Sequence, residues 1–182
     1  MNSGRIFKFG ILALVMIACL QGSLCAQGVL RWHHSMEKAK ADAKRFNKNI
    51  LVFFTGSDWC PPCKALESTV LKDPTFIKHT SSRWVLLELD FPRKKSLGEA
   101  QTRHNNSLRQ KFGVSAFPTM VIATPDGELI AGVAGYGGQK PSTYYKRLKE
   151  VEAKYSTDKK ENQPDNEDEK TSPKSNQPPL EV

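Results

Sequence analysis

Residues 50–63, ILVFFTGSDWCPPC, join a continuous apolar run to a pair of cysteines. The apolar part, 50–54, is rich in β-branched and aromatic residues, which is typical of a strand buried on both faces. Residues 55–58 predict a turn, and Pro61 and Pro62 suit the first turn of a helix, where a missing N–H would have no partner. A doubly buried strand that leads through a turn into a helix indicates an α/β fold.

The rest of 27–155 alternates between helical and extended patterns. Met36, Ala39, Ala43 and Phe46 follow Ser35 at the helical period, so this face is expected to lie on the core. Further helices are predicted at 60–70, at about 74–77, at 99–112 and at 141–155. Strands are predicted at 84–89, 119–123 and 128–133, the last two as a hairpin. This order of elements predicts a central mixed sheet with helices on both faces.

The two ends of the chain differ in composition from the middle. Arg5 and Lys8 precede an apolar run over 9–20, and small residues lead to Ala26, a pattern typical of a signal peptide cleaved after residue 26. Two alternatives are lipid attachment at Cys19, in a sequence that loosely resembles a lipoprotein box, and an uncleaved anchor. Residues 156–182 are almost free of large apolar side chains and are predicted to be a disordered polar tail. The folded domain is therefore expected at 27–155.

Removal of the signal peptide would leave Cys60 and Cys63 as the cysteines of the mature chain. A structural zinc site needs four ligands, and the four histidines show no zinc-binding spacing, so no metal is expected. A disulfide that closes so short a loop would stabilise the fold little, and one pair of cysteines is no disulfide framework. The pair is therefore interpreted as a reactive dithiol that works without a further cofactor.

The chain is basic, with 27 Lys and Arg against 19 Asp and Glu. The predicted exported domain has no aromatic residues interleaved with its basic runs, so nucleic acid is not expected as a partner. Arg93-Lys94-Lys95 is interpreted as a solvated loop, with attraction to anionic lipid or to an acidic partner as the second reading.

The position of the two cysteines on the predicted helix suggests different tasks. A helix N-terminus stabilises a thiolate, so Cys60 is expected to be the exposed nucleophile. Cys63 lies one turn deeper and is expected to be the resolving thiol. Glu67 follows Cys63 by one further turn on the same face. Its carboxylate is either the acceptor of the Cys63 proton or an ordinary surface group.

Two stretches, ILVFFTGSDWCPPCKALE and LRQKFGVSAFPTMVI, resemble the thioredoxin superfamily across most of 30–155. The resemblance implies a thioredoxin fold, in which Pro118 is a cis-proline lying against the dithiol. It also implies that Trp59, Phe117 and Pro118 contribute to substrate binding. Many thioredoxins carry a buried Asp six residues before the first cysteine, and this chain has Phe54 there. Proton transfer would then use Glu67 or water.

The stretch WCPPCKALESTVLKDPTF is most similar to exported proteins of the DsbH type and to the C-terminal domain of DsbD. This likeness implies a periplasmic thiol-disulfide oxidoreductase that reduces substrate disulfides through the Cys60/Cys63 dithiol. A disulfide oxidase or isomerase, and a binding module without redox activity, are the alternatives. The implied partners are exported proteins with disulfides or thiols and a membrane electron donor of the DsbD type. The protein is expected to act as a monomer.

Overall fold

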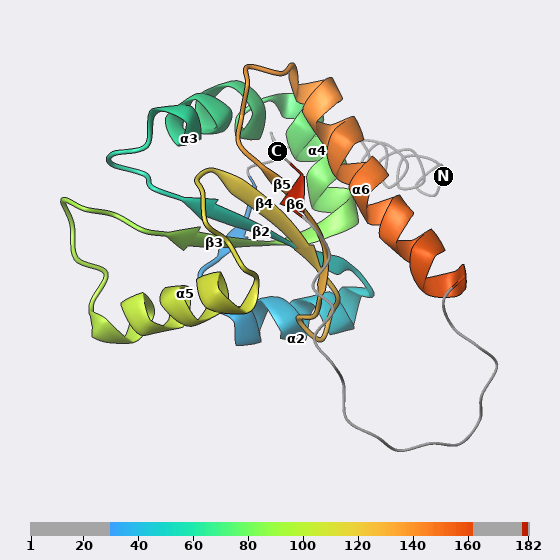
Figure 1. The fold of residues 1–182 in the computed structure, drawn as a ribbon, viewed down its shortest axis with the longest axis horizontal. Coiled ribbons are helices and arrows are strands. Elements are labelled where there is room, and N and C mark those ends of the chain that lie inside the picture. The colour runs from blue at the N-terminus through green and yellow to red at the C-terminus, as the bar shows by residue number, and fades with distance from the viewer. Residues whose placement is uncertain (1–29, 162–179, 182) are drawn as a thin grey trace, which may run out of the picture.

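A computed structural model describes residues 30–161 and 180–181 (Figure 1). The predicted signal peptide and residues 162–179 of the predicted tail lie outside this part of the chain. The elements, in chain order, are β1 Trp32–His33, α2 Met36–Phe46, β2 Asn49–Thr55, α3 Pro61–Leu66, the π-helical turn η2 Glu67–Leu71, α4 Pro74–Arg83, β3 Trp84–Asp90, α5 Glu99–Lys111, β4 Thr119–Ala123, β5 Leu129–Ala134, α6 Pro141–Glu161 and β6 Leu180–Glu181.

The strands form a single mixed sheet in the order β1-β3-β2-β4-β5-β6. β2 pairs in parallel with β3 and antiparallel with β4, so the strand that leads to the cysteines lies inside the sheet. The predicted mixed sheet is therefore confirmed. The sequence patterns did not predict β1 and β6, which are two residues long each. α6 also extends to Glu161, past the end predicted at residue 155.

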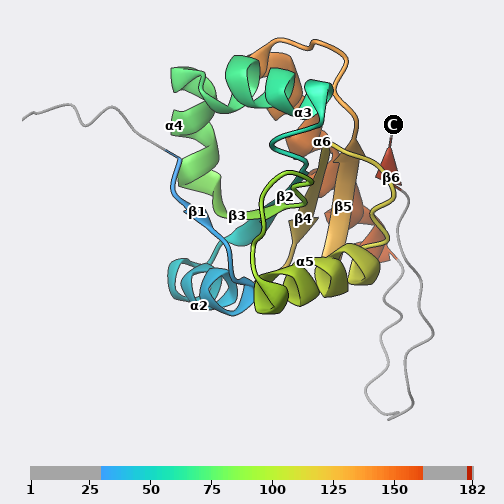
Figure 2. The same cartoon turned by 90° about the vertical axis from the view of Figure 1, so that its left-hand side faces the viewer.

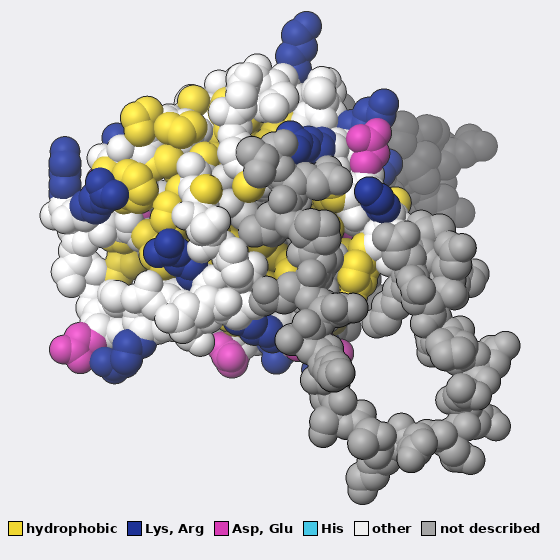
Figure 3. Space-filling view, in the orientation of Figure 1, with side chains coloured by type: hydrophobic (Ala, Val, Ile, Leu, Met, Phe, Trp, Pro, Cys, Tyr) yellow, Lys and Arg dark blue, Asp and Glu magenta, His cyan; other side chains and the backbone are white. Residues whose placement is uncertain are grey.

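Two helical layers cover the sheet (Figures 1 and 2). α3, α4 and α6 lie on one face, and α2 and α5 lie on the other. Figure 3 shows hydrophobic side chains at the surface on the side where α3 begins. No helix in the described part of the chain is long and apolar enough to span a bilayer.

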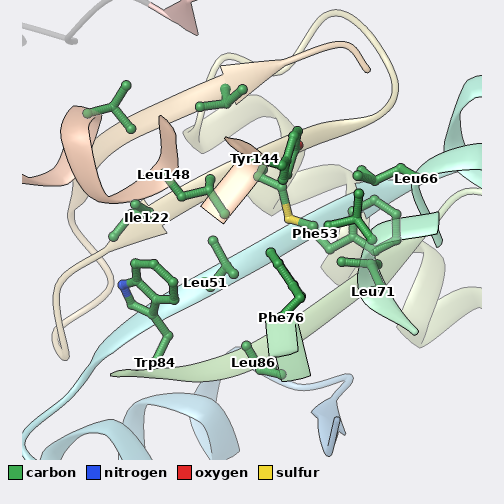
Figure 4. Packing of buried hydrophobic residues seen from close by; sticks show 14 of the residues in the cluster. Leu51, Phe53, Leu66, Leu71, Phe76, Trp84, Leu86, Ile122, Tyr144 and Leu148 are labelled. Atoms are coloured by element: carbon green, nitrogen blue, oxygen red, sulfur yellow. The ribbon is translucent and has the colours of Figure 1, made fainter. Parts of the chain in front are cut away.

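Alternate residues of β2 enter two separate cores, as expected for a strand buried on both faces. Leu51 and Phe53 pack with residues of α3, α4 and α6, including Leu66 and Tyr144 (Figure 4). Ile50, Val52 and Phe54 belong to the second core, with α2 and α5. Both faces of β2 are therefore buried, and this packing fixes the position of its C-terminal end, which leads to the cysteines.

Phe46 does not share the buried face of α2, contrary to the sequence prediction. Met36, Ala39 and Ala43 are buried, whereas Phe46 is 53% exposed. At 100° per residue, Phe46 lies roughly 50° away from the centre of the other three positions. α2 ends there, and Asn47 turns the chain with a φ of 50°. The Phe46 ring lies at the surface beside the Arg45 guanidinium, 5.3 Å from the ring centre.

A buried carboxylate joins α6 to the far end of the sheet. Glu152 is 5% exposed. Its carboxylate accepts hydrogen bonds from Asn49 Nδ2 at 2.7 Å and from Trp84 Nε1 at 3.0 Å. It also forms an ion pair with Arg83, at 2.6 Å from Nη2. One side chain of α6 thus connects the starts of β2 and β3 and the end of α4.

Candidate active site

The cysteines lie at the C-terminal end of β2, where a tight turn starts α3. Trp59 N and Cys60 N both donate to Gly56 O, at 3.2 and 2.9 Å. Cys60 is the N-cap residue of α3, and Pro61 and Pro62 fill the next two positions, as the sequence predicts. Cys60 and Cys63 form a disulfide with an S–S distance of 2.06 Å. The structure therefore brings the two predicted redox residues together in the first helical turn.

Burial does not distinguish the two cysteines in this disulfide form. Cys60 is 2% exposed and Cys63 is 1% exposed, so the expectation of an exposed Cys60 is wrong for the oxidised state. The cross-link holds Cys60 Sγ over the helix start, where it accepts a hydrogen bond from Cys63 N at 3.3 Å. The two residues differ in their position along the helix, because Cys60 is the N-cap of α3 and Cys63 lies within its first turn.

Gly56 allows the indole of Trp59 to fold back over the turn. A Cβ atom at position 56 would lie 2.5 Å from Trp59 Cε2, closer than side-chain atoms pack. The indole Nε1 donates to Phe91 O at 2.7 Å. The residue before Cys60 is therefore held in place by the loop that follows β3.

Trp59 also contacts a second aromatic residue predicted to bind substrate. Its ring centre lies 5.8 Å from that of Phe117, in an edge-on arrangement. Phe91 extends the group, 5.1 Å from Phe117. Trp59 and Phe117 are both half-buried, and Pro118 is buried after a cis Phe117–Pro118 peptide bond. These residues form an aromatic wall beside the dithiol turn.

Two arginines that the sequence did not single out as site residues lie on this wall. The guanidinium carbon of Arg93 lies 3.8 Å from the Trp59 ring centre. That of Arg109 lies 5.3 Å from the centre of Phe117, and Arg109 Nε donates to Val114 O at 2.9 Å. The sequence predicts a solvated loop for Arg93, because its spacing gives no sign of contact with Trp59, 34 residues earlier.

Two aspartates tie the loop after β3 to the dithiol turn. The Asp58 carboxylate accepts from the backbone N–H groups of Arg93 and Lys94, which lowers the pKa of Asp58 despite some desolvation. Asp90 accepts from Ser57 N and Oγ and pairs with Lys95 at 3.0 Å. Burial raises the pKa of Asp90, but these hydrogen bonds outweigh it, so the pKa lies below its ordinary value. Both aspartates are thus anions that position the loop.

Glu67 begins η2, directly after α3, and its backbone N–H donates to Cys63 O. Its carboxylate lies 3.7 Å from Lys72 Nζ and is 44% exposed. The side chain lines a pocket of about 380 Å³ together with Trp32 and Glu88. Burial raises the pKa of Glu88, and the charge of Glu67 adds to this effect. The Glu67 carboxylate therefore forms its ion pair with Lys72. The structure shows no contact between this carboxylate and the Cys63 sulfur.

Phe54 occupies the position where many thioredoxins carry a buried acid. It is 0% exposed and packs against Phe91 and Phe112, with ring centres 6.3 and 6.2 Å away.

Within residues 30–161 and 180–181, no three His, Cys, Asp or Glu side chains come together as metal ligands.

Residues 35–152 match the family model of the thioredoxin-like domain. The chain is 32% identical over 102 residues to the disulfide bond reductase DsbH of Chlamydia pneumoniae, covering 56% of this chain and 61% of that protein. It is 28% identical over 111 residues to the thioredoxin-related protein DsbJ of the same organism, covering 61% of this chain and 32% of that protein. The match therefore spans less than two thirds of either relative.

A solved structure of a DsbH oxidoreductase superposes with a TM-score of 0.63 at 29% identity. The superposition covers 68% of this chain and 85% of that structure.

Proposed function

The protein belongs to the thioredoxin-like family, and on that premise we propose that it is a periplasmic thiol-disulfide oxidoreductase that reduces disulfides of other exported proteins. The Cys60–Cys63 disulfide at the N-terminus of α3 carries the proposal. The similarity to a disulfide bond reductase supports the direction of the reaction. The predicted signal peptide supports the location.

In the proposed reaction, the reduced protein passes two electrons to the substrate. The Cys60 thiolate attacks one sulfur of the substrate disulfide, which forms a mixed disulfide and releases the first substrate thiolate. Cys63 then loses its proton and attacks the Cys60 sulfur. This step forms the Cys60–Cys63 disulfide and releases the second substrate thiolate, and both substrate thiolates take up protons from water. A membrane dithiol donor of the DsbD type would return the two electrons.

The two prolines support the reducing direction. An N-cap side chain accepts hydrogen bonds from the backbone N–H groups two or three positions on. Pro62 removes the first of these donors, and Cys63 N supplies the second. The Cys60 thiolate therefore has fewer donors than a helix start without prolines provides. Because a strong oxidant depends on a stabilised reduced form, the loss of a donor favours a low reduction potential.

The reduction potential, measured by equilibration with glutathione, tests the direction. We expect a value near that of thioredoxin, about −270 mV, and reduction of insulin disulfides by the pre-reduced protein. A potential near about −120 mV would instead assign the protein as an oxidase. Failure to exchange with glutathione or insulin at all would leave the chain as a binding module.

We also propose that Glu67 accepts the Cys63 proton during resolution, because no other carboxylate of α3 or η2 follows Cys63 by one turn. Glu67→Gln is expected to leave attack by Cys60 unchanged and to slow resolution roughly tenfold near neutral pH, less than a strictly required base contributes. Above the ordinary thiol pKa, about 8.5, Cys63 ionises unaided and the rates should converge. Single-turnover resolution of a preformed mixed disulfide measures this.

Lys72→Gln is the matched control, because it removes the ion pair of Glu67 but keeps the carboxylate. It should resolve at the wild-type rate. Equal rates for Glu67→Gln and wild type from pH 6 to 9 would show that water takes the proton. Equal slowing in the two variants would assign the effect to the ion pair.

A further inference from the structure

The aromatic wall beside the dithiol carries positive charge on both of its main rings. Arg93 stacks on Trp59, the residue before Cys60, at 3.8 Å. Arg109 lies over Phe117, the residue before Pro118, at 5.3 Å. Stacking on an aromatic face holds a guanidinium in place while its N–H groups stay available to a ligand. A polypeptide that reaches the dithiol along this wall would meet both charges.

Neither guanidinium forms an ion pair with a carboxylate among the described residues. Other arginines of the domain do, since Arg83 pairs with Glu152 and Arg103 pairs with Glu99. The nearby Asp58 carboxylate accepts from backbone N–H groups of the loop. Within the described part of the chain, the guanidinium groups of Arg93 and Arg109 are therefore not held in an ion pair and can pair with a carboxylate of an incoming chain.

Arg109 also borders a pocket that suits a carboxylate. The pocket has a volume of about 370 Å³ and is lined by Asn106, Arg109, Gln110, Gly113, Val114 and Ser115. Arginine, amide and hydroxyl groups all donate hydrogen bonds, and a carboxylate accepts up to about four. Figure 3 shows basic side chains beside the hydrophobic surface where α3 begins. Arg109 thus belongs both to this pocket and to the aromatic wall that includes Trp59, the residue before Cys60.

We propose that Arg93 and Arg109 select substrate polypeptides that carry acidic side chains close to their disulfide. The inference rests on the proposed reductase activity and adds the class of substrate. An Asp or Glu on one side of the disulfide pairs with Arg93 over Trp59, and one on the other side pairs with Arg109 in the adjoining pocket. Both arginines position the substrate, whereas the electrons still come from the dithiol.

The test uses the pre-reduced protein and three disulfide peptides that differ only in the residues flanking the disulfide, which are Glu, Gln or Lys. Single-turnover reduction gives a second-order rate constant for each peptide. We expect the Glu peptide to react fastest and the Lys peptide slowest, with a preference that shrinks as salt screens the charges. Arg93→Gln and Arg109→Gln should each lower the rate for the Glu peptide about fivefold and change the rate for the Gln peptide less than about twofold.

Arg103→Gln is the matched control, because it removes the same charge from α5 at an exposed residue paired with Glu99. It should keep the wild-type preference, and Arg109→Lys should keep part of it. If Arg93→Gln and Arg109→Gln lower the rate constants for the Glu and Gln peptides equally, the arginines have a structural role and the proposal is overturned. A wild-type protein that reduces all three peptides equally would overturn it while the reductase function stands. A protein that reduces none of them would refute both.

Discussion

Cys60→Ser is expected to reduce disulfide exchange to the uncatalysed rate, because a serine hydroxyl neither ionises near neutral pH nor forms a disulfide. Cys63→Ser should behave differently. Its Cys60 thiolate can still attack, but nothing resolves the product, so the mixed disulfide with the substrate accumulates. Each variant lacks one of the two sulfur atoms, which lie at opposite ends of the first turn of α3. Non-reducing electrophoresis and mass spectrometry distinguish the trapped complex from the free protein.

Peptide mapping of the trapped complex supplies the control, because the substrate should be joined to Cys60. The converse result, in which Cys60→Ser traps substrate on Cys63 and Cys63→Ser does not, would reverse the roles of the two thiols. It would also remove the reason for assigning Glu67 as the acceptor of the resolving thiol's proton.

Glu152→Ala is expected to lower the free energy of unfolding by about 3 kcal/mol. Breaking a buried pair by removing one partner typically costs about 3–5 kcal/mol. The lower end applies because Arg83 is 39% exposed and can be rehydrated, whereas Asn49 and Trp84 lose their acceptor. Urea denaturation of wild type and variant measures the difference.

Glu150→Ala provides the comparison, since it removes a carboxylate two residues away on α6. Glu150 pairs with Lys146 at 3.6 Å, and its side chain is 62% exposed. An exposed pair of this kind contributes at most about 0.5 kcal/mol. A Glu152→Ala protein as stable as the Glu150→Ala protein would show that the contacts of Glu152 do not stabilise the fold.

The sequence predicted those parts of the fold that depend on local pattern. The apolar run before the turn located β2, and the two prolines located the start of α3, because each signal lies inside the element that it predicts. The prediction for Phe46 is wrong because Phe46 is the last residue of α2 and lies at the edge of the helix face that Met36, Ala39 and Ala43 bury. β1 escaped prediction because two residues are too few to show an alternation.

The parts of the site that could not be predicted depend on contacts between distant residues. Arg93 reaches Trp59, and Arg109 reaches Phe117, only because the loop after β3 and the end of α5 meet beside the dithiol turn. In the sequence, Glu152 looks like any other charged residue of a polar helix, because its contacts with Arg83 and Trp84 form only in the folded chain. Charge and aromatic character are visible in a sequence, but the pairing of such groups is a property of the folded chain.

The burial of both cysteines in the oxidised protein also bears on how electrons enter it. With Cys60 and Cys63 only 2% and 1% exposed, a freely diffusing small thiol meets little of the disulfide. A docked protein can rearrange the surrounding side chains and bring its own thiolate in line with the buried sulfurs. The buried disulfide is therefore expected to exchange faster with a protein that docks beside it than with a free small thiol such as glutathione.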